Sequence, residues 1–210
     1  MELHDLYLDH PFTMVVAGPT GSGKTSWIKK IIENAPIVSK PPPEQIIYFY
    51  GEYQPLFTQL KNVTFIQGIS EEIISHLSGE NAWIIIDDLM NESSNSLLIS
   101  ELFTKGSHHR NLSVILILQN FFQQRRQMRN ITLNSQYIVL FKNARDKSLA
   151  TNLGKQMYPG KVKKFQHVFE EATRDEYSYL FIDLKSKTRD DMRLKGNVLG
   201  EKEYISVYSI

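Results

Sequence analysis

Short apolar runs alternate along this chain with segments whose apolar residues recur at helical spacing. Because the runs are short and apolar, we expect them to be β-strands. They cover Phe12–Ala17, Gln45–Tyr50, Val63–Gln67, Ala82–Asp87, Leu112–Leu118 and Gln136–Phe141. Several runs are apolar on both faces, which is typical of a parallel sheet covered by helices on each side. The pattern therefore predicts an α/β fold.

Helices are predicted between these runs. The first follows a glycine-rich turn and has Trp27, Ile28, Ile31 and Ile32 on one face. Consecutive prolines then predict a stiff, extended connection over Lys40–Pro43. The other predicted helices are Ser70–Leu77 with Ser70 as its N-cap, a segment containing Leu97, Leu98, Leu102 and Phe103, and a segment from about Asp146 to Met157.

The alternation weakens after Pro159–Gly160. We expect a helix over Val162–Phe169, a strand over Tyr177–Asp183 and an antiparallel edge hairpin near Tyr204–Val207. The chain contains no internal repeat or low-complexity segment that would indicate a linker between domains. The sequence thus predicts one domain over residues 1–210, with a core over about 12–157 and an extension over about 158–210. Its expected architecture has three layers, with a mostly parallel central sheet flanked by helices.

Composition narrows the class of protein. The 210 residues, 41% hydrophobic and 22% charged, suit one soluble globular domain. No apolar run approaches the roughly 20 residues that span a bilayer, so no membrane partner is expected. Met1–Pro11 lacks the pattern of a signal peptide, which predicts an intracellular protein that is not secreted. The chain has no cysteine, which excludes disulfides and cysteine nucleophiles, and its net charge of +1 neither indicates nor excludes a nucleic-acid partner.

A complete G-x-x-x-x-G-K-[ST] pattern lies between the first predicted strand and the first predicted helix. Such a loop directs backbone N–H groups toward phosphates at the helix N-terminus. We therefore expect a P-loop NTPase that binds ATP with Mg²⁺. Lys24 is predicted to reach the β- and γ-phosphates, and the Thr25 hydroxyl to ligate magnesium. The predicted nucleotide-binding residues are Gly18, Pro19, Thr20, Gly21, Ser22, Gly23, Lys24 and Thr25.

Three polar residues follow two other apolar strands. Asp87 and Asp88 end the run Ala82–Asp87, and Gln119 follows Leu112–Leu118. Ligands of open α/β sheets bind at the carboxyl ends of the strands. Asp87 is a candidate magnesium ligand, and Asp88 is a candidate for polarising the attacking water. An amide such as that of Gln119 can donate to a phosphate oxygen and accept from the water.

The motifs GPTGSGKT, WIIIDDLM and SVILILQN together resemble those of the HerA/FtsK-type DNA-translocating ATPases. Within that group the chain is similar to the packaging ATPases of Maverick/Polinton elements and of adenovirus-like and poxvirus-like viruses. The stretches LFTKGSHHRN and IVLFKNARD are similar as well, and the resemblance covers roughly residues 12–157. ATPases of this layout mostly have glutamate where this chain has Asp88. That side chain is one methylene shorter than glutamate and departs from the family's pattern at the position that places the water.

The resemblance implies a homo-oligomeric ring that drives double-stranded DNA into a capsid. It also implies capsid proteins as partners and the host nucleus or a viral assembly site as the location. Such rings complete each active site with an arginine from a neighbouring subunit. The candidates for that catalytic arginine are Arg110, Arg129 and Arg145.

A small-molecule or nucleoside kinase is the main alternative. In that reading Arg125, Arg126 and Arg129 would act as lid arginines. In the translocase reading, Arg125 and Arg126 with Phe121 and Phe122 could line a DNA channel or form a solvated helix face. A guanine-specific switch is disfavoured because Asn143-Ala144-Arg145-Asp146 lacks the lysine of the N-K-x-D pattern.

Overall fold

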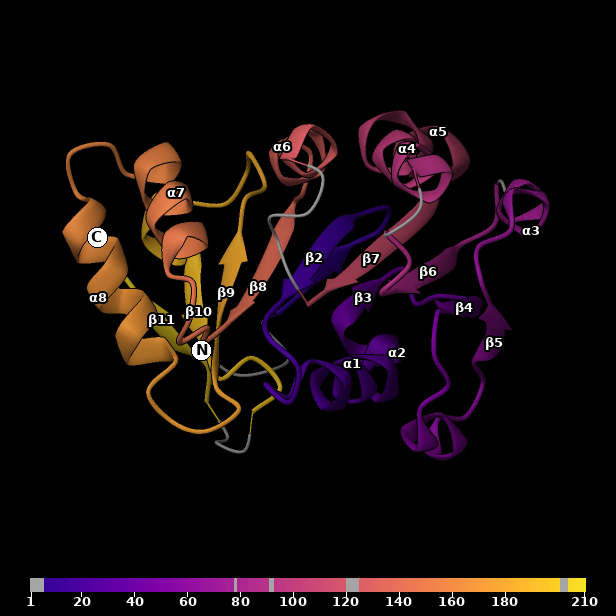
Figure 1. Ribbon diagram of the computed structural model, residues 1–210, viewed down its shortest axis with the longest axis horizontal. Helices are drawn as coiled ribbons and strands as arrows, with labels where there is room; N and C mark the ends of the chain where they lie inside the picture. The colour runs from indigo at the N-terminus through magenta and orange to yellow at the C-terminus, as the bar shows by residue number, and fades with distance from the viewer. Residues whose placement is uncertain (1–5, 78, 91–92, 120–124, 201–203) are drawn as a thin grey trace.

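The computed structural model describes residues 6–77, 79–90, 93–119, 125–200 and 204–210. A nine-stranded sheet runs through this part of the chain in the order β11-β10-β9-β8-β2-β7-β6-β4-β5 (Figure 1). The strands from β8 to β5 are parallel, and β9, β10 and β11 continue the sheet in antiparallel fashion. Their bounds are β2 Thr13–Ala17, β4 Gln45–Tyr50, β5 Thr64–Gln67, β6 Ala82–Asp87, β7 Leu112–Leu118, β8 Tyr137–Phe141, β9 Tyr179–Asp183, β10 Leu194–Gly196 and β11 Ser206–Tyr208.

Helices connect the strands, and two very short strands pair beside the main sheet. These two, β1 (Leu8–Asp9) and β3 (Ser39–Lys40), are parallel to each other. The α-helices are α1 Lys24–Glu33, α2 Ala35–Val38, α3 Glu71–His76, α4 Ser93–Glu101, α5 Ser107–Arg110, α6 Arg125–Leu133, α7 Ser148–Met157 and α8 Val162–Ala172. Short 3₁₀ or π segments, η2 Pro55–Gln59, η3 Leu102–Gly106 and η4 Asp190–Met192, complete the set.

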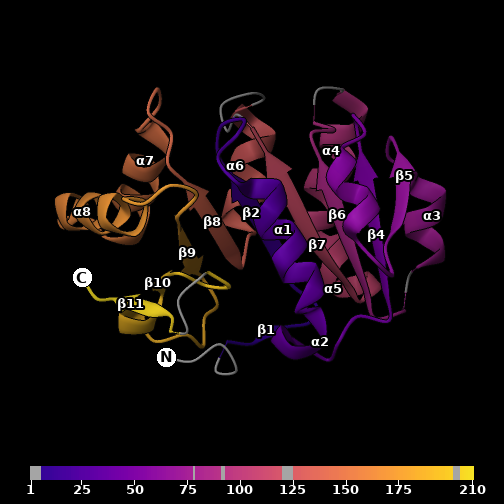
Figure 2. The same cartoon turned by 90° about the horizontal axis from the view of Figure 1, so that it is seen from below.

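Helices cover both faces of the sheet. Helices α1 and α2 lie on one face, and α4, α6 and α7 lie on the other (Figures 1 and 2). Trp27, Ile28 and Ile31 of α1 are buried against the first face, and Ile131 of α6 and Leu153 of α7 are buried against the second. The predicted three-layer α/β architecture with a mostly parallel core is confirmed, and the full sheet is mixed. Within the described residues, no helix has both the length and the apolar character needed to cross a membrane.

The position of β7 fixes where the polar strand ends meet. It lies between β2, which leads into the glycine-rich loop, and β6, which ends at Asp87. In register, Asp87 pairs with Ile117 of β7, and Ala17 of β2 pairs with Leu118. Parallel strands present their carboxyl ends at one edge of a sheet. The residues that follow β2, β6 and β7 are therefore neighbours at one edge.

Most predicted elements are confirmed, including the bounds of β4, β6 and β7. The Ser70 side chain caps α3 as predicted, accepting a hydrogen bond of 3.3 Å from the backbone N–H of Ile73. The strand predicted from Tyr177 instead begins at Tyr179, because a turn closes first: the backbone N–H of Ser178 donates to the Asp175 carbonyl. Leu97 was expected on the apolar face of its helix, but 56% of it is exposed.

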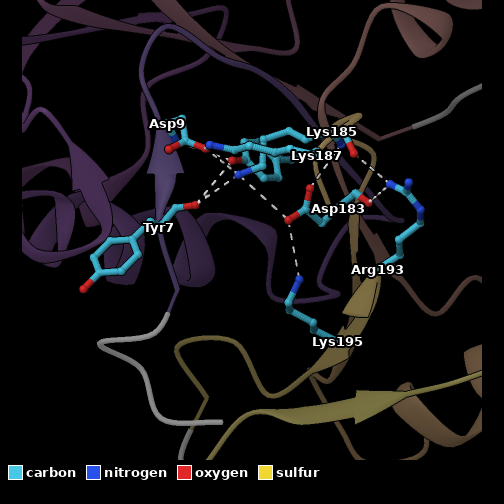
Figure 3. Close-up of polar contacts among 8 residues, drawn as sticks. Tyr7, Asp9, Asp183, Lys185, Lys187, Arg193 and Lys195 are labelled. Atoms are coloured by element: carbon cyan, nitrogen blue, oxygen red, sulfur yellow. Dashed lines mark hydrogen bonds and ion pairs between the residues drawn. The ribbon is translucent and has the colours of Figure 1, made fainter. Parts of the chain in front are cut away.

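A cluster of charged side chains joins the segment before β2 to the C-terminal strands (Figure 3). Asp9 forms ion pairs of 2.7 Å with both Lys185 and Lys187. Asp183, at the end of β9, lies 3.5 Å from Lys195 Nζ and 4.0 Å from Lys185 Nζ. The side chains of Lys195 and Asp183 are only 5% and 9% exposed. Such buried charges are tolerated only because they are paired.

This cluster gives a stability prediction. Asp183→Ala should lower the free energy of unfolding by about 3–5 kcal/mol, because it leaves the Lys195 ammonium buried without its ion pair. Asp191→Ala is the matched control, since Asp191 forms a 2.7 Å pair with Arg189 in which both side chains are largely exposed. It should cost less than about 1 kcal/mol in urea unfolding. Equal losses for the two variants would contradict a buried, stabilising role for Asp183.

Candidate active site

The glycine-rich loop between β2 and α1 has the backbone that its sequence predicts. Gly21 and Gly23 have φ of 76° and 98°, a left-handed conformation that glycine adopts without strain. Gly18 is required for another reason: a Cβ there would lie 2.6 Å from Phe141 Cβ and 2.7 Å from Ser22 Oγ. The backbone N–H of Gly18 donates to the Leu118 carbonyl at 3.2 Å, which ties the loop to β7.

Lys24 lies inside this loop. Its side chain is buried, and its ammonium donates to the Gly18 carbonyl at 2.6 Å and to the Pro19 carbonyl at 2.9 Å. Burial lowers the pKa of Lys24, while the carboxylates of Asp87 and Asp88 act in the opposite direction. The ammonium therefore lies where the loop curls, within the electrostatic reach of both carboxylates.

Asp87 is a buried carboxylate at the end of β6. Its Oδ2 accepts a hydrogen bond of 2.8 Å from the Tyr48 hydroxyl and one of 3.2 Å from Gln54 Nε2. Burial raises the pKa of Asp87 in spite of these bonds, and the neighbouring charge of Asp88 raises it further. The two hydrogen bonds therefore do not fully offset the cost of burying the negative charge of Asp87. A cation beside it would supply the missing charge.

Asp88 and Gln119 are joined to the glycine-rich loop by a chain of hydrogen bonds. Gln119 Nε2 donates to Asp88 Oδ2 at 2.9 Å, and the Thr20 hydroxyl donates to Gln119 Oε1 at 2.9 Å. Asp88 is exposed and has φ of 55°, a left-handed value that aspartate tolerates better than most residues. These hydrogen bonds connect the glycine-rich loop, the residue after β6 and the residue after β7, which are far apart in the sequence.

These residues fit a nucleotide with magnesium. The loop offers backbone N–H groups at the start of α1, and the half-buried Thr25 in its first turn adds a hydroxyl oxygen. Among the described residues no group of three or more histidine, aspartate or glutamate side chains could hold a metal alone. Mg²⁺ usually takes one or two protein oxygens, with phosphates and water completing its shell. Thr25 and Asp87 would supply the protein oxygens of such a site.

None of the three candidate arginines makes a polar side-chain contact with the loop among the described residues. Asn143 and Asp146, which flank Arg145 in the chain, line a cavity together with Gly18 and Gln119. Arg110 ends α5 before β7, at the sheet edge opposite Gln119. Arg129 on α6 and Arg145 after β8 are exposed. Within the described part of the chain, no side chain of these three forms a hydrogen bond or ion pair. Phe121 and Phe122 lie outside the described residues, as do the side chains of Arg125 and Arg126.

Comparison with known proteins identifies the class. Residues 10–166 match the family described as AAA domain. The chain belongs to the AAA domain family. It is therefore a P-loop ATPase, and membership implies nucleotide binding, usually with Mg²⁺. A search of curated protein sequences gives no match.

Several solved structures align with this AAA domain, one of them with a TM-score above 0.5. The cytoplasmic domain of the type VII secretion ATPase EccC from Thermomonospora curvata aligns with a TM-score of 0.53 and 11% identity, over 84% of this chain and 24% of the other. Thermomonospora curvata EccC (ATPases 2 and 3) with a signal sequence peptide gives 0.47 and 14%, over 60% and 30%. The cytoplasmic domain of EssC gives 0.46 and 15%, over 66% and 33%. The chain thus spans a third or less of each, and the likeness concerns the fold alone.

Two residues at this site were not predicted from the sequence. Tyr48 and Gln54 hold Asp87, yet Tyr48 lies within the apolar run of β4 and Gln54 lies in the loop that follows. Burial and the adjacent Asp87 raise the pKa of Tyr48, so its hydroxyl remains a donor. A tyrosine within an otherwise apolar strand was the available signal, because a buried hydroxyl needs a partner.

The environment of Asp87 gives a second prediction. Its folded-state pKa is raised, so its ionised form destabilises the protein without nucleotide or metal. Asp87→Asn should therefore raise the melting temperature in chelator-treated protein, by a margin that grows as pH rises from about 4 toward neutrality. It should also remove the magnesium-dependent part of stabilisation by ATP.

Asp88→Asn is the matched control. Asp88 is exposed, and its charge contributes to the raised pKa of Asp87 less than burial does, so this variant should raise the melting temperature without ligand by less than Asp87→Asn does. Thermal unfolding with and without Mg²⁺ measures both effects. An Asp87→Asn variant that is less stable than the wild type at every pH would contradict this account of Asp87.

Proposed function

We propose that this AAA domain hydrolyses ATP to translocate double-stranded DNA, and that it works as a homo-oligomeric ring packaging a viral or transposon genome into a capsid. The observation that carries the hydrolytic part is the hydrogen bond of 2.9 Å between Gln119 and Asp88. It sets an amide and a carboxylate side by side at the edge where the loop would hold phosphates. That pair suits the placement of a water molecule.

Each residue has a distinct proposed role. When bound, ATP with magnesium supplies the γ-phosphoryl group and the positive charge that offsets it. Lys24, whose ammonium donates to the carbonyls of Gly18 and Pro19, would offer its charge to the β- and γ-phosphates, and Thr25 and Asp87 would hold the metal. Gln119 donates to Asp88 Oδ2, and the Asp88 carboxylate is the group that would accept the proton of the attacking water. Gln119 orients that water and senses the phosphate.

The DNA substrate is supported by the resemblance of the loop, of the strand ending in Asp87 and Asp88, and of the strand before Gln119 to translocating ATPases. The arginines add a structural argument. Transition-state charge on the phosphoryl group calls for a guanidinium. Arg110, Arg129 and Arg145 make no polar side-chain contact within the described part of their own subunit, which leaves them available to a neighbour's site.

The kinase alternative is less well supported. A kinase must exclude water from the γ-phosphate and admit an acceptor hydroxyl instead. Here the exposed pair of Asp88 and Gln119 faces solvent next to the loop. An open, water-accessible carboxylate suits hydrolysis better than transfer to a small acceptor.

An ATPase assay across protein concentration, with and without long double-stranded DNA, tests the motor. Specific activity should rise with concentration and with DNA, because subunits that gather on one duplex complete one another's sites. The stimulation should fall steeply with salt as phosphate contacts release counterions. Specific activity that does not change with protein concentration or with DNA would contradict the proposed translocase function. Phosphorylation of an added nucleoside would favour the kinase alternative.

Mixing two inactive variants supplies the control within the same assay. The Lys24→Ala variant should have an inactive phosphate site and intact arginines. A variant that lacks the shared arginine should have an intact phosphate site and no arginine to offer its neighbour. Among Arg110→Ala, Arg129→Ala and Arg145→Ala, the true trans-acting residue should regain part of wild-type activity on mixing with Lys24→Ala. A residue that acts within its own site should not.

A further inference from the structure

An open pocket of ≈ 340 Å³ adjoins the glycine-rich loop on the side away from Asp88. Gly21 and Ser22 line one wall, and the turn between α8 and β9 lines the other, together with Lys142. Its volume is within the range of small-molecule sites. The two walls come from opposite ends of the chain, so this pocket exists only in the folded domain.

Tyr177 is the aromatic residue of the far wall. It is 60% exposed, although tyrosine rings are usually at least half covered, and its φ of 59° is unusual for a bulky residue. A turn holds it there, since both the backbone N–H and the hydroxyl of Ser178 donate to the Asp175 carbonyl. A Cβ built on Gly23 would lie 3.2 Å from the Tyr177 ring. The ring therefore stands against the loop and leaves much of its surface open.

The orientation of a bound nucleotide follows from the sheet order. β7 and β6 lie on one side of β2, and β8 and β9 lie on the other (Figure 1). Asp87, Asp88 and Gln119 follow β6 and β7, so the γ end of the phosphate chain points to that side. The nucleoside then leaves toward β8 and β9. Tyr177 lies there, two residues before β9 begins.

We infer that the Tyr177 ring stacks on the base of the nucleotide whose phosphates lie in the Gly18–Thr25 loop. The inference rests on the proposed ATP binding and assigns its base contact. Aromatic stacking tolerates any base because every base has a π-face. The charged residues at the pocket are the cations Lys142 and Arg174 and the anions Asp175 and Glu176, so their formal charges cancel and the ring rather than net charge carries the contact with the base.

Calorimetric titration with ATP and with inorganic tripolyphosphate, each with Mg²⁺, tests this assignment. Tyr177→Ala should weaken ATP binding by about 5- to 150-fold, the usual range for loss of one stacked base. It should leave tripolyphosphate binding within about twofold of wild type, because that ligand has no base. Tyr177→Phe should bind both ligands like the wild type. The matched control is Tyr204→Ala, which removes another exposed tyrosine, on the C-terminal edge of the domain.

Two outcomes would overturn the inference alone. ATP binding that is unchanged in Tyr177→Ala would mean that the ring does not touch the base. Equal weakening of ATP and tripolyphosphate would mean that Tyr177 only supports Gly23. A wild-type protein that binds neither ligand would overturn the proposed function as well, so the two failures are distinguishable.

Discussion

The insertion of β7 between β2 and β6 is the constraint on which the site depends. It sets the carboxyl ends of three strands side by side, so that the loop after β2, the carboxylates after β6 and the amide after β7 share one sheet edge. Hydrogen bonds from Thr20 to Gln119 and from Gln119 to Asp88 then span the three elements. If β7 were elsewhere, the same residues would lie too far apart to act on one phosphate.

Two buried charged side chains lie at this edge. Lys24 is inside the loop, and burial lowers its pKa, whereas burial raises the pKa of Asp87. Both shifts disfavour the charged forms, so each group carries an energetic penalty that a bound phosphate or cation would relieve. In the cluster of Asp183 and Lys195 at the opposite edge, burial also lowers the pKa of Lys195, and the Asp183 carboxylate 3.5 Å from its ammonium acts in the opposite direction. That cluster joins the C-terminal strands to the segment before β2.

Much of this could be predicted from sequence because the signals are local. The glycine-rich motif specifies a backbone conformation, and the apolar runs specify strands, so β4, β6 and β7 were located to the residue. Contacts between distant segments carry no such signal. Tyr48 and Gln54 reach Asp87 only through strand pairing, and the turn that exposes Tyr177 depends on Asp175 and Ser178 bonding after α8 ends. Under the proposed function, the choice among Arg110, Arg129 and Arg145 depends on a neighbouring subunit, which one chain does not specify.

The central claim is that the pair of Asp88 and Gln119 directs water, rather than another acceptor, to the γ-phosphoryl group. Hydrolysis of ATP in water labelled with heavy oxygen, followed by mass spectrometry of the products, tests it most directly. The account predicts that the label appears in the released inorganic phosphate and is absent from ADP, and that Asp88→Asn slows its appearance by about 100-fold while ATP still binds. Consumption of ATP without labelled phosphate, with the phosphoryl group recovered on an added nucleoside, would contradict the account.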